Sequence, residues 1–267
     1  MKGRNHGFSA ALLVVLGILW SVPLLAVAYG AIMASDHNRT LSYGLDPGIA
    51  RTLAISVLVC TVASVLSTTF GTMAGYAISQ KRFYGKKLLF GALVGAMFFP
   101  PVVFMAPLFK IVASLHIYDT LAALILPSAA TAFSVVYMKV VIDRVPSSTL
   151  DAAKIDGVGE IAILTRIILP IVRGPLAALL VLQFIATWGA LAVPMAVVGS
   201  PRNYTLTLRL AMAIQRLYRV PERDLLWTIG LIAIPAIVLF LLKARDLITG
   251  VMGALFRYEP VDSDMHY

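Results

Sequence analysis

Hydrophobic residues along this chain are gathered into long runs, and polar residues fall mainly between the runs. A helix rises about 1.5 Å per residue, so crossing a hydrocarbon core of about 30 Å takes about 20 mostly apolar residues. Six such runs predict six transmembrane helices in a single domain, and therefore an all-α polytopic membrane protein. The predicted spans cover about residues 8–33, 52–79, 88–109, 120–142, 174–199 and 225–243 of residues 1–267.

The first run follows two basic residues, Lys2 and Arg4, as the apolar part of a signal peptide does. That part of a signal peptide is usually about 7 to 15 residues long, and this run is longer. We therefore interpret the run as an uncleaved first span.

The basic residues beside the spans predict the orientation of the chain, because Lys and Arg are enriched in cytoplasmic loops. With the N-terminus inside, 14 basic residues face the cytoplasm and 8 face outward, five of them in one loop. This distribution predicts that both termini are cytoplasmic. It also predicts a cytoplasmic loop at about residues 143–170 and a periplasmic loop at about residues 200–224.

Composition and charge agree with a membrane location. Hydrophobic residues make up 60% of the chain and charged residues 13%, against about 25% charged residues in a typical soluble domain. The net charge of +9 would suit nucleic acid or anionic lipid, but its position beside the spans assigns most of it to orientation, so we expect no nucleic-acid partner and keep membrane lipid as a partner. The one cysteine, Cys60, excludes an intramolecular disulfide, and we expect no metal site.

Several function classes are disfavoured by what the sequence lacks. The interior of each predicted span has no Asp, Glu, Lys, Arg or His, although ion-coupled carriers usually place such groups at membrane depth. Polar residues at depth, such as Thr131 and Gln183, are expected to form hydrogen bonds between helices. No G-x-x-x-x-G-K-[ST] loop, G-x-S-x-G elbow or H-E-x-x-H helix occurs, which argues against an enzyme and against nucleotide binding by that loop. Any energy must enter through a partner.

The predicted cytoplasmic loop has the pattern of two short amphipathic helices. Pro146 followed by a serine hydroxyl favours a helix start, and Gly157 permits a left-handed stop. A second helix is predicted over residues 158–169, ending before Pro170. Its apolar residues Ile161, Leu164, Ile167 and Ile168 follow the spacing of a single helical face. Two such helices at a membrane surface suit a docking element.

Residues 151–170 contain Asp151-Ala152-Ala153, then Gly157 after three residues, then Ile167-x-Leu169-Pro170 after nine more. This pattern resembles the Glu-Ala-Ala loop of permease subunits in binding-protein-dependent ATP-binding-cassette (ABC) importers. Asp151 stands where that family usually has Glu, which shortens the side chain and keeps its charge. Asp156-Gly157 resembles the carbohydrate branch, which includes maltose and glycerol-3-phosphate permeases. The resemblance covers about residues 8–257, although Gly189 and Leu191 depart from the usual pattern after Trp188.

This resemblance implies the fold of a type I importer permease and the import of a sugar or sugar-like solute by alternating access. It implies two ATPase subunits carrying ATP and Mg²⁺, a second and different permease subunit, an extracytoplasmic solute-binding protein, and no cofactor in this chain. It also implies that the loop docks on the ATPase. The implied ATPase-coupling residues are Asp151, Ala152, Ala153, Asp156, Gly157, Ile167, Leu169 and Pro170.

Two further groups of residues are candidates for binding. Aromatic faces stack on sugar rings and an amide can pair with hydroxyls, so the substrate-path candidates are Phe99, Tyr137, Gln183 and Trp188. In the outer loop, arginines spaced seven residues apart would form one positive stripe wherever they share a helix. These arginines, Arg202, Arg209 and Arg216, are candidates for docking the binding protein, and the alternative is a helix lying on anionic lipid headgroups.

Two alternative functions stay open at this point. One is a permease of another cassette branch, for amino acids, polyamines or oxyanions, which Asp156-Gly157 disfavours. The other is an ion-coupled carrier or intramembrane enzyme, which the absence of ionisable residues at membrane depth disfavours.

Overall fold

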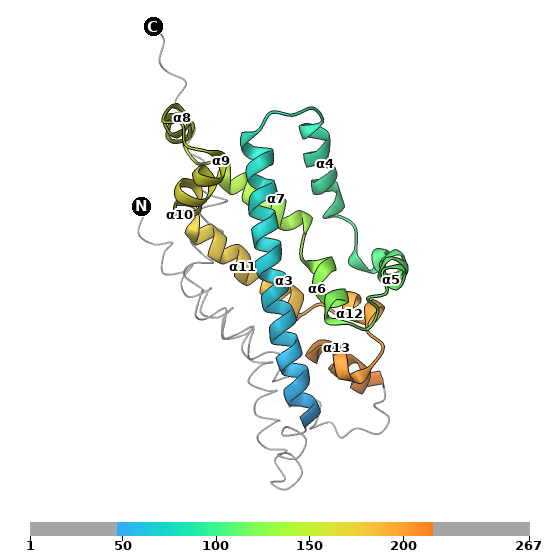
Figure 1. The fold of residues 1–267 in the computed structure, drawn as a ribbon. Helices are drawn as coiled ribbons and strands as arrows, with labels where there is room; N and C mark the ends of the chain where they lie inside the picture. The colour runs from blue at the N-terminus through green and yellow to red at the C-terminus, as the bar shows by residue number, and fades with distance from the viewer. Residues whose placement is uncertain (1–46, 216–267) are drawn as a thin grey trace, which may run out of the picture.

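The computed structural model describes residues 47–215, and within this range the chain forms helices joined by short turns, without a strand (Figure 1). The predicted spans 8–33 and 225–243, both termini and Arg216 lie outside the described residues. Within them, the helices Gly48–Gln80 and Leu121–Ile142 are long and apolar enough to cross a membrane. Counting each of two bent helix pairs as one span gives up to four crossings in this part of the chain.

Helix α3 (Pro47–Gln80) is the long central helix, and it packs against α7 (Ala132–Ile142) and α11 (Arg173–Trp188). Two glycines of α3 make the approach to α7 possible. A Cβ at Gly71 would lie 2.6 Å from Ser134 Cβ, and one at Gly75 would lie 2.8 Å from the backbone nitrogen of Lys139. We call this contact the glycine seam. It has the G-x-x-x-G spacing that brings helices together in membranes.

The span predicted over 88–109 is divided in two. Helix α4 (Lys86–Ala96) is followed by η1 (Pro101–Phe104) and α5 (Met105–Ser114), and the two parts are bent by 104°. Pro100 and Pro101 explain the break, because each lacks a backbone N–H and disfavours helix at the residue before it. Pro100 is accordingly extended, with φ −61° and ψ 134°.

Two more of the predicted spans are interrupted, those over 120–142 and 174–199. Residues 120–142 form α6 (Leu121–Ile125), η2 (Leu126–Ser128) and α7, which Thr131 caps by accepting a hydrogen bond from Ser134 N. Residues 174–199 form α11 and, beyond Gly189, α12 (Ala192–Val197). The segment predicted as an outer loop then contains η4 (Pro201–Asn203) and α13 (Leu206–Gln215).

The segment between α7 and α11, residues 147–171, is called the surface element here. It contains α8 (Ser147–Ile155), α9 (Glu160–Ala162), the π-helix η3 (Ile163–Ile168) and α10 (Leu169–Ile171). The predicted helix end before Pro170 is wrong, because the helix continues through it to Ile171. A proline ring clashes with the carbonyl four residues earlier in an α-helix, and the wider π turn before Pro170 relieves that clash.

Two apolar clusters lie at opposite ends of α3. Near its Gln80 end, Leu150 and Ala153 of α8 pack with Met138, Ile163 and Ile168. Near its Pro47 end, a second cluster joins α3 to α5, α6, α12 and α13. Its buried members are Val59, Val112, Ala123, Leu124, Val197, Val198 and Leu208. The surface element is therefore held at one end of the molecule, and α13 at the other (Figure 1).

Candidate functional site

Helix α8 begins and ends where the loop pattern predicts. Pro146 stands before its first turn with φ −55° and ψ 129°, although no side-chain hydroxyl caps the helix, so the predicted cap is wrong. At the other end Gly157 has φ +73°, its N–H donates to Lys154 O and the next N–H donates to Ala153 O. This is a Schellman stop, in which glycine avoids the strain that a Cβ would bring.

The two faces of α8 are sharply different. Leu150 and Ala153 are buried, whereas Asp151 and Ala152 are exposed and Ile155 keeps 85% of its surface accessible. Ile161, just after the turn, is 80% exposed beside a hollow of about 560 Å³. Large apolar side chains at this exposure, next to small and acidic ones, form an exposed apolar patch of the kind that marks an interaction site. We call it the uncovered surface of α8.

The structure distributes the eight predicted coupling residues between this surface and the core. Ala153 is buried, and Ile167 and Leu169 are half-buried. The exposed members are Asp151, Ala152, Asp156, Gly157 and Pro170.

The second predicted amphipathic face is wrong in detail. Ile161 and Ile168 were expected on one helical face, but Ile161 is exposed and Ile168 is fully buried. The π turn between them has more residues per turn than an α-helix, which rotates the later residues away from the earlier ones.

One carboxylate of the surface element is bound to α3. Glu160 accepts a hydrogen bond from the Tyr76 hydroxyl and pairs with the Lys81 ammonium. The bond to Lys81 has the largest effect and the bond to Tyr76 the next, and both lower the pKa of the Glu160 carboxyl. The carboxyl is therefore charged at neutral pH. On α8, Asp151 and Lys154 form a looser pair at 3.7 Å.

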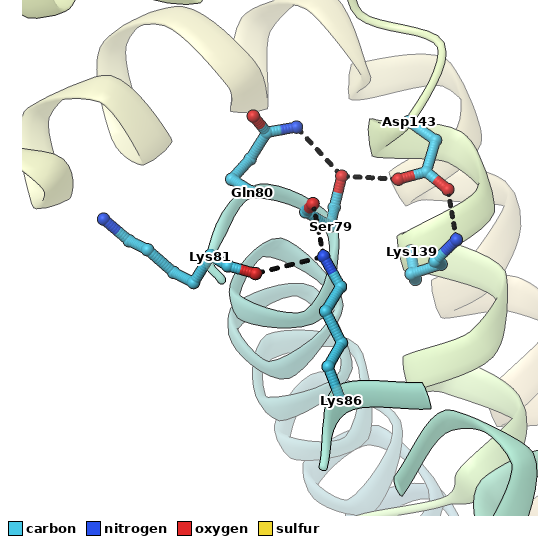
Figure 2. Close-up of polar contacts among 6 residues, drawn as sticks. All are labelled: Ser79, Gln80, Lys81, Lys86, Lys139 and Asp143. Atoms are coloured by element: carbon cyan, nitrogen blue, oxygen red, sulfur yellow. Dashed lines mark hydrogen bonds and ion pairs between the residues drawn. The ribbon is translucent and has the colours of Figure 1, made fainter. Parts of the chain in front are cut away.

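A polar network closes the Gln80 end of α3 (Figure 2). The Ser79 hydroxyl donates to Asp143 at 2.6 Å, and Asp143 also pairs with Lys139 of α7. The Lys86 ammonium donates to the carbonyl oxygens of Ser79 and Lys81, at 3.1 and 3.0 Å. A cation placed there satisfies carbonyls that the helix leaves unpaired and opposes the negative end of its dipole.

The substrate-path candidates are not brought together. Gln183 is 5% exposed and its amide donates to Thr131 Oγ1 at 2.6 Å, which confirms the expected hydrogen bond between helices. Trp188 is 5% exposed and stacks on Phe184. The Tyr137 hydroxyl donates to Pro175 O, and Phe99 is exposed in the break between α4 and η1.

The arginine candidates lie at the Pro47 end. Arg202 is exposed on η4 and Arg209 is half-buried on α13, so these two do not share a helix, and Arg216 lies outside the described residues. The carbonyl of Arg202 accepts from Arg51 Nε at 3.1 Å. The Arg209 guanidinium donates to Thr52 Oγ1 at 3.2 Å, which ties α13 to α3.

A clasp nearby fixes the turn before α6. The Asp119 carboxylate accepts hydrogen bonds from the backbone N–H groups of Gly199 and Ser200, each at 3.1 Å, while Asn203 donates to the Asp119 carbonyl at 2.6 Å. Partial burial raises the pKa of Asp119, but the hydrogen bonds from Ser200 and Gly199 outweigh it, so the net pKa is lowered. We call this set the Asp119 clasp.

Sequence reasoning missed the Tyr76–Lys81–Glu160 group and the glycine seam. The seam has a readable signal, because Gly71 and Gly75 have G-x-x-x-G spacing inside an apolar run. The pairing of Tyr76 with Glu160 joins residues 84 positions apart, and no local pattern predicts it.

An all-helical chain with membrane-length apolar helices and an uncovered helical element at one end fits a membrane component that works with a second protein. Residues 26–249 match the family described as binding-protein-dependent transport system inner membrane component. The chain belongs to this family, as its loop pattern predicted, and is therefore a transport permease component of the inner membrane.

Curated relatives and solved structures agree with this assignment. The chain is 31% identical over 196 residues to the arabinooligosaccharides transport system permease protein AraQ of Halalkalibacterium halodurans, covering 73% of this chain and 70% of that protein. It is 26% identical over 271 residues to the diacetylchitobiose uptake system permease protein NgcG of Streptomyces coelicolor, covering 95% and 90%.

A crystal structure of a bacterial ABC transporter involved in the import of the acidic polysaccharide alginate contains a chain with the same fold. The TM-score is 0.75 at 20% identity, over 92% of this chain and 98% of that one. The predicted all-α importer-permease fold is confirmed.

Proposed function

We propose that this chain is the membrane-spanning permease subunit of an ATP-driven importer, and that it moves a sugar or sugar-like solute by alternating access. The observation that carries the proposal is the uncovered surface on α8, with Asp151, Ala152 and Ile155 outward on a helix anchored by Leu150 and Ala153. A helix fixed on one face and uncovered on the other is suited to transmit force from a docked protein.

The docked protein in this proposal is the ATPase. Ala152 is small and exposed, so another backbone can approach it closely, and Asp151 offers a charge to a basic or polar group. ATP and Mg²⁺ are held by two ATPase subunits, whose closure favours one state of the permease over the other. A partner can shift a conformational equilibrium only by binding the two states with different affinities. In this proposal, the closed ATPase pair docked at α8 binds one state of the permease more tightly than the other.

We place the Gln80 end of α3 in the cytoplasm. Lys81, Arg82, Lys86 and Lys87 follow this end, and Lys139 pairs with Asp143 beside it. This placement follows the bias of basic residues toward the cytoplasmic side, and it puts both termini in the cytoplasm. Labelling of an introduced cysteine at Arg82 from outside intact cells would overturn it.

The proposal of a sugar substrate rests on the names of the relatives, which are permeases for arabinooligosaccharides and diacetylchitobiose, and on the Asp156-Gly157 pair. A ligand screen of the binding protein that stimulates this permease tests it. Sugars should raise the melting temperature of that protein. Stabilisation by amino acids, polyamines or oxyanions alone would establish the alternative.

The solute path is proposed to include Phe99 and Tyr137. Gln183 and Trp188 are used in packing between helices of this chain, so they contact solute only in a state where those helices separate. Alanine at Phe99 should weaken uptake of the solute without lowering ATPase binding. Unchanged uptake would remove Phe99 from the path.

The remaining partners are proposed to be a second, non-identical permease subunit and an extracytoplasmic binding protein. Co-purification of this chain with a second copy of itself and no other permease would refute the first. For the second, Arg202 is the most accessible of the described arginine candidates. Arg202→Glu should weaken stimulation by the binding protein. Unaltered stimulation with weaker binding to anionic vesicles would assign this arginine to lipid.

Reconstitution with the ATPase tests the proposed function as a whole. Ala152→Phe adds bulk to the exposed face of α8, away from the core, so the chain should fold while ATPase binding and ATP-dependent uptake are lost. Ser114→Phe, an exposed site on α5 far from α8 (Figure 1), is the matched control and should behave as wild type. ATP-dependent uptake by the Ala152→Phe variant at the wild-type rate, or uptake by the purified chain without any ATPase, would contradict the proposal.

A further inference from the structure

The backbone connection between α8 and α11 departs from regular α-helix at two points. The first is the Gly157 stop, where the chain reverses through a left-handed turn. The second is η3, a π-helix, whose hydrogen bonds span a wider turn than those of an α-helix. Beyond it, the chain bends by 85° into α11. The backbone path from α8 to α11 therefore passes through both of these points.

Glu160 lies between these two points and is bonded to a different helix. Its carboxylate accepts the Tyr76 hydroxyl and pairs with the Lys81 ammonium, and both partners belong to the Gln80 end of α3. Lys154 of α8 also acts on it electrostatically and favours its charged form. The surface element therefore has a direct side-chain connection to α3 that does not pass through η3.

The Tyr76 side chain and the Lys81 backbone are both held in place. The Tyr76 ring is 6% exposed and belongs to the apolar cluster that contains Leu150 and Ile163, so its hydroxyl has little freedom. Lys81 N–H donates to Ala77 O, and the Lys81 carbonyl accepts from the Lys86 ammonium, as Figure 2 shows. The Tyr76 hydroxyl is thus held by packing, and the Lys81 side chain, 43% exposed, extends from a backbone that is held at the end of α3.

The helix that receives this pull is itself joined to α7. The glycine seam packs the two backbones together, and Ser79 is bonded to Asp143 at the end of α7. Motion delivered at the Gln80 end would move α3 and α7 as a unit.

We propose that Glu160 is a positioning residue of the transport cycle, which transmits movement of α8 to α3 through Tyr76 and Lys81. This inference rests on the proposed function, because it requires a partner that moves α8. It assigns to Glu160 a role separate from docking: without it, the ATPase binds and hydrolyses ATP, but the membrane helices follow poorly.

The first test uses Glu160→Gln and Tyr76→Phe in vesicles containing the full complex. Glu160→Gln removes the charge that pairs with Lys81, and Tyr76→Phe removes the hydroxyl that donates to Glu160. Both variants preserve the shape of the side chain. Uptake per ATP hydrolysed should fall about tenfold, the size expected when a hydrogen bond to a charged group is lost. ATPase binding to the permease should be unchanged. A loss of uptake in strict proportion to the amount of folded complex would mean a structural role only and would overturn the proposal.

The second test exchanges the charges. Lys81→Glu and Glu160→Lys should each uncouple transport, and the double variant should recover at least about half of the wild-type uptake per ATP, because the pair is restored with reversed sign. The control combines Glu160→Lys with Lys87→Glu, at an exposed lysine in the first turn of α4, and should show no recovery. Equal recovery with Lys87→Glu, or none with Lys81→Glu, contradicts the link.

Failure of this link and failure of the proposed function give different results. If the chain is not an importer permease, the wild-type complex shows no solute-stimulated ATP hydrolysis, and both ideas are refuted. If only the link is wrong, the wild type and the Glu160 variants transport with the same number of solutes per ATP.

Discussion

The glycine seam and the surface element are held by opposite means. In the seam, positions for Cβ atoms at Gly71 and Gly75 lie under 3 Å from atoms of α7, so the two helices cannot shift without breaking the contact. The surface element keeps Ile155 and Ile161 at least 80% exposed, and it contacts α3 through the Glu160 carboxylate and through the apolar cluster that contains Tyr76. The comparison indicates a rigid pair of membrane helices with an adaptable element attached to its end, and replacing single residues can separate the two.

The largest effect is expected in the seam. Gly71→Ala would place its Cβ 2.6 Å from Ser134 Cβ and 2.8 Å from the Ser134 carbonyl carbon, where backbone must move. Overpacking of this kind costs about 1–3 kcal/mol, so the melting temperature in detergent should fall clearly. The control is Gly91→Ala on α4, where nothing lies within 4 Å. It should be neutral or stabilising by up to about 1 kcal/mol, because alanine favours helix. Equal melting temperatures for both variants would contradict the seam.

An intermediate effect is expected at the end of α8. Gly157 has φ +73°, so valine there is strained by about 1–2 kcal/mol in the folded element. Solute-stimulated ATP hydrolysis and uptake should fall about 5- to 30-fold, with little change in the melting temperature of the membrane helices. Gly159 is two residues away, extended at φ −66° and ψ 154°, and open to solvent. Gly159→Val should therefore keep activity. Full coupling in Gly157→Val would show that the left-handed stop is dispensable.

The smallest effect is expected in the Asp119 clasp, which is half-buried and only fastens a turn. The pKa of the Asp119 carboxyl is lowered in the folded protein from an ordinary value of 3.8. The ionised carboxylate therefore contributes stability that is fully present above pH 3.8 and is lost as pH falls through the folded pKa. Asp119→Asn should lower stability at neutral pH by less than about 1 kcal/mol, because solvent screens the site.

Thermal melts from pH 7 to pH 3 provide the measurement for this clasp. The difference between wild type and Asp119→Asn should be constant at neutral pH and should shrink below pH 3.8. A difference that grows on acidification would mean that the charge of Asp119 does not stabilise the clasp.

Sequence patterns predicted the features that depend on neighbouring residues. The run at 52–79 forms α3 with its ends shifted by a few residues. Pro146 and Gly157 mark the start and the end of α8 as predicted. The break at Pro100-Pro101 has a local signal too, but hydropathy alone counts the prolines as part of an apolar run. The glycine spacing of the seam was similarly readable.

The remaining features depend on packing between distant segments. The burial of Gln183 and Trp188 follows from how α3, α7 and α11 come together, and hydrophobicity does not distinguish a packed tryptophan from an accessible one. The π turn before Pro170 compensates for a clash that sequence reasoning resolves by ending the helix. The bond between Tyr76 and Glu160 connects two segments with no shared pattern.

The central claim, that the exposed face of α8 docks on an ATPase, is tested most directly by cysteine cross-linking. The single native cysteine, Cys60, is 2% exposed and does not compete for a reagent in water. Ala152→Cys should form a cross-link with the co-expressed ATPase through a short bifunctional reagent, and Ser114→Cys on α5 should not. Labelling of Ala152→Cys by a small thiol reagent without any cross-link to the ATPase would show that this face is accessible but undocked, and would contradict the claim.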